Sequence, residues 1–186
     1  MRVLVTIIVL GLMHCVTSNA QTRLDACEAK ISSTLGRALL ERFPGYRLPR
    51  VTDNLRDDVR FDLANGGDGC ISVASADFDG DGTKDFAIGL TPKQGVVPIV
   101  VVALSRNDTW VFSTLKSWVD QRIRLYVAAV SPGIYKRPES TDTPLERDDR
   151  NSTRCTNSAV KVGATESTGI VYCYANRTWT YVWVSD

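Results

Sequence analysis

The sequence predicts an α+β domain in which one N-terminal helix packs on a mostly antiparallel, twisted β-sheet. Three observations lead to this fold class. Between residues 25 and 43, apolar residues recur every four positions, which is the spacing of one helix face. From residue 71 onward, apolar residues alternate with polar ones or form short Val-rich runs, as strands do. The connections between these runs are mostly short, and short connections favour antiparallel pairing.

The helix is expected over residues 25–43. Its start has Thr22 and Asp25 as candidate capping residues, and Pro44-Gly45 ends it. Its apolar face should pack on the sheet and consists of Cys27, Ile31, Leu35, Leu39 and Phe43. An extended link that contains proline is expected to follow over residues 46–63.

The strands are expected in the order of the apolar segments. Residues 96–104 form a continuous apolar run, which predicts a central strand covered on both faces. Tight turns are expected at 167–168 and 176–177. The remaining predicted strands are the flanks of an acidic segment (71–73 and 86–90), then 109–115, 123–130, 159–166, 169–175 and 179–184.

Residues 131–155 differ from this pattern because prolines and charged residues crowd them. The sequence predicts a long loop here. Loops of this length without regular structure are often functional, and the alternative is a solvated loop without a role.

The acidic segment gives the strongest indication of chemistry. Four aspartates fall within the nine residues 77–85, and such close carboxylates repel one another by roughly 1 kcal/mol per pair even in water. Calcium takes six to eight oxygen ligands in a flexible arrangement. The expected calcium ligands are the carboxylates of Asp77, Asp79, Asp81 and Asp85 and the carbonyl of Thr83. A metal-free turn rich in Asp and Gly is the alternative.

Residues 76–89 resemble the calcium hairpins of FG-GAP and VCBS repeats, as found in integrin alpha-subunit propellers and many bacterial exported proteins. The resemblance implies a metal role for Asp77, Asp79, Asp81, Thr83 and Asp85. There is no second copy of the motif, so a multi-bladed propeller is not predicted. The twelfth loop position is Ile88, where the helix-loop-helix type of calcium loop has Glu, which predicts weak affinity of about 0.1 to 1 mM.

The first twenty residues predict an export signal, with Arg2 at its start, an apolar core over 3–13 and a small-x-small cleavage site at 18–20. Residues 21–186 then form one domain. No later apolar run is long enough to span a bilayer. We therefore expect a soluble periplasmic or secreted product.

Loss of this segment removes Cys15 and leaves four cysteines, which predicts two disulfides in an oxidising compartment. Three pairings remain open; the Cys27–Cys70 and Cys155–Cys173 combination closes loops of moderate length. His14, which is the only histidine, is also lost, and this excludes Ser-His-Asp catalysis and His-ligated zinc. The formal charge falls to zero, so no basic field attracts nucleic acid.

The function expected from these features is a non-enzymatic, exported, calcium-binding protein that binds a protein partner in the cell envelope. By analogy with small periplasmic proteins that carry such loops, a more specific version is an inhibitor or immunity protein against a cell-wall hydrolase. Residues 131–155 are then the first candidate contact. A second hypothesis is a wall-associated or carbohydrate-binding module whose platform is Trp179, Tyr181 and Trp183. A third is a glycoside hydrolase that uses two carboxylates.

Overall fold

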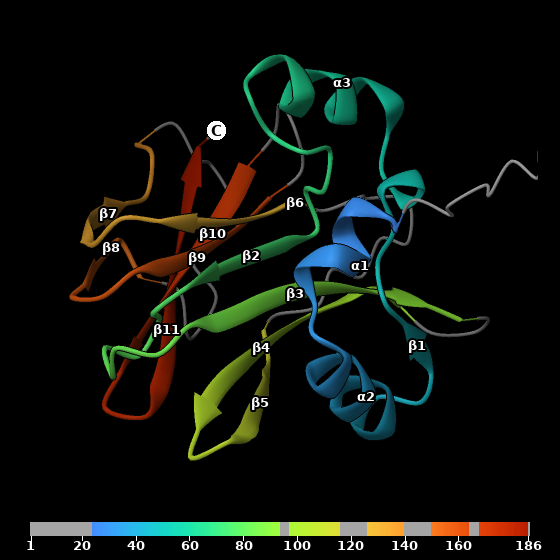
Figure 1. Cartoon of the computed structure of the whole chain (residues 1–186). Helices are drawn as coiled ribbons and strands as arrows, with labels where there is room; N and C mark the ends of the chain where they lie inside the picture. Colours follow the sequence, from blue (N-terminus) through green and yellow to red (C-terminus); the bar gives the residue numbers. More distant parts are fainter. Residues whose placement is uncertain (1–23, 94–96, 116–125, 140–149, 164–167, 186) are drawn as a thin grey trace, which may run out of the picture.

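The computed structural model describes residues 24–93, 97–115, 126–139, 150–163 and 168–185. Its elements form four layers, namely helices, a five-stranded sheet, a four-stranded sheet and a two-stranded hairpin (Figure 1). All strand pairs among the described residues are antiparallel, in agreement with the predicted α+β class at this level of detail. The predicted export signal lies outside the described residues.

The predicted single helix over 25–43 is wrong, because the chain forms two helices there. Helix α1 spans Ala26–Lys30 and begins where the Asp25 carboxylate accepts a hydrogen bond from the Cys27 amide at 2.9 Å. Ile31 is extended, and the Ser32 hydroxyl then caps α2, Ser33–Arg42, by accepting from the Leu35 amide. Serine and threonine compete for helix backbone groups in this way, so a Ser-Ser-Thr run favours a helix start over a helix interior.

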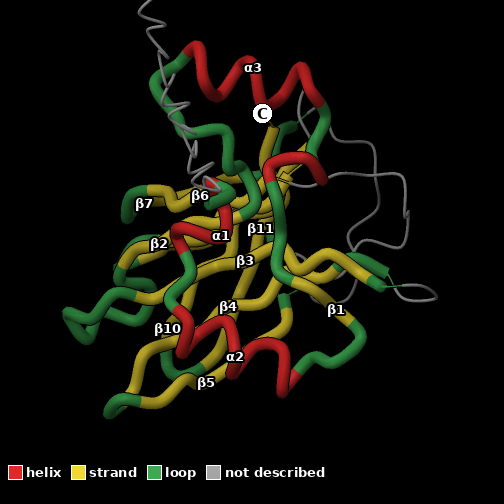
Figure 2. Tube along the Cα trace, turned by 45° about the vertical axis from the view of Figure 1, so that its right-hand side comes forward, coloured by secondary structure: helices red, strands yellow, loops and turns green. Residues whose placement is uncertain are grey.

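The link after α2 is also more structured than predicted. It contains the short strand β1, Tyr46–Arg47, a 3-10 turn at Val51–Asp53 and helix α3, Arg56–Ala64. No residue of α3 is buried. Figure 1 shows α3 standing apart from the sheets, while α1 and α2 lie against the first sheet in both views (Figures 1 and 2). Because α3 makes so few core contacts, its sequence has no strong apolar periodicity by which to predict it.

The first sheet has the order β1-β3-β4-β5, and β2 also pairs with β3. Its central strand β4 confirms the prediction of a strand covered on both faces. Ile99, Val101 and Ala103 join the core under the helices, whereas Val100, Val102 and Leu104 join the core between the two sheets. The other strands are β2 (Val73–Ala76), β3 (Asp85–Pro92), β4 (Ile99–Arg106) and β5 (Thr109–Thr114).

The second sheet has the order β11-β10-β9-β6, so the prediction of one sheet is wrong. Strand β4 is apolar on both faces, so other elements must pack on each face. The helices pack on one face and the second sheet packs on the other. The two sheets meet where the Val127 amide donates to the Ile71 carbonyl at 2.7 Å. The strands are β6 (Tyr126–Val130), β9 (Ala159–Gly163), β10 (Thr168–Ala175) and β11 (Thr178–Ser185).

The turn between β10 and β11 matches the prediction for residues 176–177. Asn176 and Arg177 have φ of 51° and 62°, the left-handed values that a tight two-residue hairpin turn requires.

The predicted loop over residues 131–155 forms strands at both ends. Strand β7, Gly133–Lys136, pairs with β8, Ser152–Cys155, and this hairpin covers the outer face of the second sheet. Residues 140–149 lie outside the described residues. The hairpin is covalently tied to the sheet, because Cys155 of β8 forms a disulfide with Cys173 of β10.

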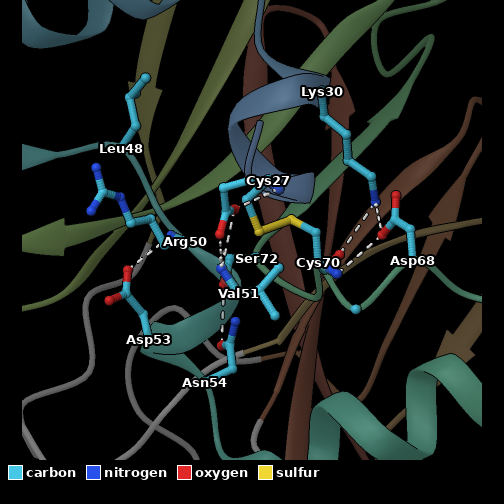
Figure 3. Close-up of a disulfide and its surroundings, with 12 residues drawn as sticks. Cys27, Lys30, Leu48, Arg50, Val51, Asp53, Asn54, Asp68, Cys70 and Ser72 are labelled. Atoms are coloured by element: carbon cyan, nitrogen blue, oxygen red, sulfur yellow. Dashed lines mark hydrogen bonds and ion pairs between the residues drawn. A yellow bond between two sulfur atoms is a disulfide. The ribbon is translucent and has the colours of Figure 1, made fainter. Parts of the chain in front are cut away.

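The second disulfide joins Cys27 of α1 to Cys70 ahead of β2 (Figure 3). Lys30, one helical turn on, pairs with Asp68 at 2.9 Å and donates to the Cys70 carbonyl at 3.3 Å. The structure thus selects one of the three pairings that the sequence left open. Among the described residues, no helix has both the length and the apolar character needed to cross a membrane.

Candidate metal centre

The acidic segment forms the loop of the β2–β3 hairpin, in the strand-loop-strand arrangement that the sequence predicts. The last paired residues before the loop are Ala76 and Asp85. Phe78, the second loop residue, is fully buried in the core between the two sheets and anchors the loop there. Gly80 and Gly82 have φ of 79° and 83°, a conformation that favours glycine.

Three of the predicted ligands converge. One carboxylate oxygen each from Asp77, Asp79 and Asp85 lies within 4.8 Å of the others, so the group can hold a metal ion. The Asp79 side chain and the whole of Asp85 have no exposed surface. Three carboxylates this close, two of them shielded from water, repel one another strongly.

Backbone amides orient these carboxylates. Asp77 accepts from the Gly80 amide at 2.7 Å and from the Gly82 amide at 2.9 Å. Asp85 accepts from the Phe78 amide at 2.9 Å and from the Ser105 amide, at the end of β4, at 2.8 Å. Each carboxylate oxygen has a second lone pair that remains available to a cation.

The other two predicted ligands lie at the edge of this group. Asp81 is outside the three converging residues, and its Oδ1 accepts from the Thr83 amide at 2.8 Å. Thr83 is exposed in the loop.

Arg106, the last residue of β4, is a member of the site that the sequence analysis missed. It forms ion pairs with Asp79 and Asp81, and its Nη1 lies 3.0 Å from Asp81 Oδ2. Lys84, the loop's own cation, is exposed. The β3–β4 register pairs Phe86 with Ala103, which brings the end of β4 alongside the loop. The position of Arg106 beside the loop could therefore be predicted only from the β3–β4 pairing.

The ionisation of the carboxylates reflects this crowding. Burial raises the pKa of Asp79, with a contribution from the charges of Asp81 and Asp77, although the Asp81 amide and Arg106 oppose the shift. Burial also raises the pKa of Asp85 against two backbone hydrogen bonds. The pKa of Asp81 is lowered, first by the hydrogen bond from the Thr83 amide. The two buried carboxylates thus carry negative charge that Arg106 and the amides do not fully stabilise.

The aromatic side chains of β11 do not form an open platform. Trp179, Tyr181 and Trp183 are half-buried and pack against the core between the sheets. The ring centroids of Tyr174 and Trp179 lie 4.9 Å apart, and those of Tyr172 and Tyr181 lie 5.7 Å apart. This stripe contributes apolar contacts to the core.

No protein-family model, curated protein or solved structure matches this chain.

Proposed function

We propose that the protein is an exported, non-enzymatic binding protein whose hairpin loop holds Ca²⁺. The observation that carries the proposal is the convergence of Asp77, Asp79 and Asp85 within 4.8 Å. A donor set made only of carboxylate oxygens suits a hard cation such as calcium. Asp81 and the Thr83 carbonyl are proposed to complete the ligands, as in the FG-GAP and VCBS hairpins that the loop resembles.

The residues present fit such an ion. Asp77, Asp79, Asp81 and Asp85 provide four carboxylates, whereas one guanidinium, that of Arg106, reaches Asp79 and Asp81. Burial raises the pKa of Asp79 and Asp85, and the charges of neighbouring aspartates add to the shift. A divalent cation at this place would stabilise both.

The proposed role of the ion is structural. Asp85 connects the loop to the β4 end through Phe78 and Ser105, so an ion at Asp85 would stiffen two neighbouring hairpins together. The two disulfides are compatible with an oxidising compartment, which supports export.

The proposed partner is a protein of the cell envelope. Exposed apolar side chains occur on and just before α3, where Leu55, Phe61 and Leu63 are 51%, 69% and 52% exposed. Helix α3 is therefore the proposed contact surface, because exposed apolar side chains are typical of protein-binding sites. Inhibition of a cell-wall hydrolase is the specific version of this role, and it rests on analogy alone.

Calcium binding is tested by calorimetry and thermal unfolding of the native protein and of the double variant Asp77→Asn, Asp79→Asn. We expect a dissociation constant of about 0.1 to 1 mM. Calcium at ten to a hundred times that concentration should stabilise the native protein by about 1.4 to 2.7 kcal/mol. The double variant should show neither effect.

The matched control is Asp57→Asn, which removes an exposed carboxylate from α3 and should leave calcium binding intact. Absence of both binding heat and thermal stabilisation in the native protein would disprove the calcium proposal.

The partner proposal has its own experiment. Native envelope proteins are captured with the intact protein and with Phe61→Ser, Leu63→Ser, which removes the exposed apolar side chains of α3. A cell-wall hydrolase captured by the first and lost with the second is the expected result. Identical capture by both proteins would show that α3 does not bind the partner, and calcium binding would be unaffected by that outcome.

A further inference from the structure

A groove lies on the side of the second sheet that the β7–β8 hairpin covers. It has a volume of about 620 Å³ and is formed between β8 and the end of the β10–β11 hairpin. This volume is within the range of sites that bind small organic molecules, about 300 to 1,000 Å³. None of its lining residues belongs to the acidic loop.

Two arginines give the groove a positive charge. Arg150 and Arg154 both line it, and the side chain of Lys136 is exposed on the neighbouring strand β7, where Lys136 pairs with Ser152. Within the part of the chain that the structure describes, neither arginine takes part in an ion pair. By contrast, Arg47, Arg50, Arg60 and Arg106 are each paired with a carboxylate. The groove therefore presents two guanidinium groups, whose planar sets of donors suit an oxyanion.

The remaining lining is suited to a hydroxylated ligand. Ser152, Thr178 and Thr180 contribute hydroxyl groups, which both donate and accept hydrogen bonds. Ile134 also lines the groove and is 54% exposed, directly opposite Arg154 in the β7–β8 pairing. An apolar side chain beside polar groups matches the surface of a sugar, whose ring has C–H faces and hydroxyl edges.

The two walls of the groove are held together before any ligand binds. Cys155, next to Arg154 in β8, is joined by its disulfide to Cys173 of β10. The hydroxyls of Thr153 and Thr180, which also line the groove, lie 3.3 Å apart and link β8 to β11. A fixed spacing lowers the entropy lost on binding, so modest contacts can yield measurable affinity.

We propose that this groove binds an acidic saccharide, with Arg150 and Arg154 on its carboxylates and the Ser and Thr hydroxyls on its ring hydroxyls. The inference is separate from the calcium proposal, because the groove and the acidic loop share no residue. It also differs from a stacking platform on β11, since the aromatic side chains of that strand face the core between the sheets.

The test compares three probes by calorimetry: a galacturonic acid trisaccharide, the neutral trisaccharide maltotriose, and sodium sulfate. We expect the galacturonic acid probe to bind at least about tenfold more tightly than either of the others, because only it has both carboxylates and ring hydroxyls. The variant Arg150→Ala, Arg154→Ala should lose at least about tenfold in affinity for it. Arg56→Ala, which removes an exposed charge from α3, should bind like the native protein.

The proposal would be overturned by no binding of the acidic probe, by equal binding of maltotriose, by equal binding of sulfate, or by unchanged affinity in the double arginine variant despite a native circular dichroism spectrum. Each titration is repeated with millimolar calcium and with a chelator. Binding that requires calcium and is lost in Asp77→Asn would place the saccharide at the acidic loop instead, and would overturn the groove assignment while leaving calcium binding established.

Discussion

Arg106 Nη1 lies 3.0 Å from Asp81 Oδ2, and the same guanidinium pairs with the buried carboxylate of Asp79. One positive side chain from β4 is thus shared between two aspartates of the β2–β3 loop. A guanidinium in this place and a bound cation have the same electrostatic effect on these carboxylates. They should therefore compete for them.

Replacement of Arg106 by glutamine tests this competition. Without calcium, we expect a loss of about 1 kcal/mol in the free energy of unfolding, a small value because the Arg106 side chain is 40% exposed. Calcium affinity should rise several-fold, since the ion no longer opposes a fixed positive charge. Chemical unfolding and calorimetry measure the two effects. Arg60→Gln, which breaks an exposed ion pair on α3, is the control, and a weaker calcium affinity in Arg106→Gln would contradict the prediction.

The two loop glycines provide a matched pair of substitutions. Both have positive φ, so alanine at either position costs about 1 kcal/mol in backbone strain. A Cβ on Gly80 would also lie 2.8 Å from the Asn157 side chain, whereas a Cβ on Gly82 meets nothing within 4 Å. We expect Gly80→Ala to be more destabilising than Gly82→Ala in urea unfolding.

The additional cost at Gly80 should depend on Asn157. In a double-mutant cycle, Asn157→Ala should remove most of the difference between the two alanine variants, because the contact is then absent. An unchanged difference in that background would mean that the loop, and not Asn157, resists the substitution.

Asp53 should make the free energy of unfolding depend on pH in the acidic range. Burial favours the protonated acid, but hydrogen bonds from Arg47, the Arg50 amide and Thr91 outweigh it and lower the pKa of Asp53. A carboxyl group with a lowered folded-state pKa stabilises the fold above its unfolded pKa of about 4. This contribution is lost as the pH falls through the folded-state value.

We therefore expect Asp53→Asn to destabilise the protein by about 1 to 3 kcal/mol at pH 7, because it loses charged hydrogen bonds to a side chain that is 19% exposed. The difference from the native protein should shrink steadily below about pH 4. Urea unfolding at a series of pH values measures it. A difference that is constant from neutral to acidic pH would show that the effect of the substitution is not electrostatic.

The two disulfides should differ in what they contribute. Cys27 and Cys70 are 43 residues apart, whereas Cys155 and Cys173 are 18 apart. On the chain-entropy model these closures stabilise the fold by about 4 and about 3 kcal/mol. Replacing each pair with alanine and measuring unfolding should reproduce that order. A larger loss for the Cys155–Cys173 pair would indicate that its link between β8 and the sheet contributes more than loop closure.

The sequence was sufficient to predict elements whose signal is local. The continuous apolar run of β4, the tight turn at Asn176-Arg177 and the hairpin around the acidic loop depend on residues that are neighbours in the chain. The spacing of the aspartates was likewise sufficient to predict Asp77, Asp79 and Asp85 as candidate metal ligands without any knowledge of the fold.

The elements that the sequence did not predict depend on contacts between distant segments. Division of the strands into two sheets depends on pairings between distant segments, such as that of β6 with β9, which are separated by residues 131–158. Arg106 reaches the acidic loop through the β3–β4 register, which no local pattern specifies. The break between α1 and α2 is different, because the sequence does contain a local signal for it in the Ser32 cap. The apolar spacing, however, continues across Ser32 and predicts one uninterrupted helix.

Strands β3 and β4 have the helices on one face and the second sheet on the other. Their amide hydrogens are consequently expected to exchange with solvent deuterium only when the whole domain opens. The exchange rates of these amides report the global free energy of unfolding under native conditions, without denaturant. The exchange rates of the first sheet thus provide an internal reference with which the faster exchange rates of the loop or of α3 can be compared.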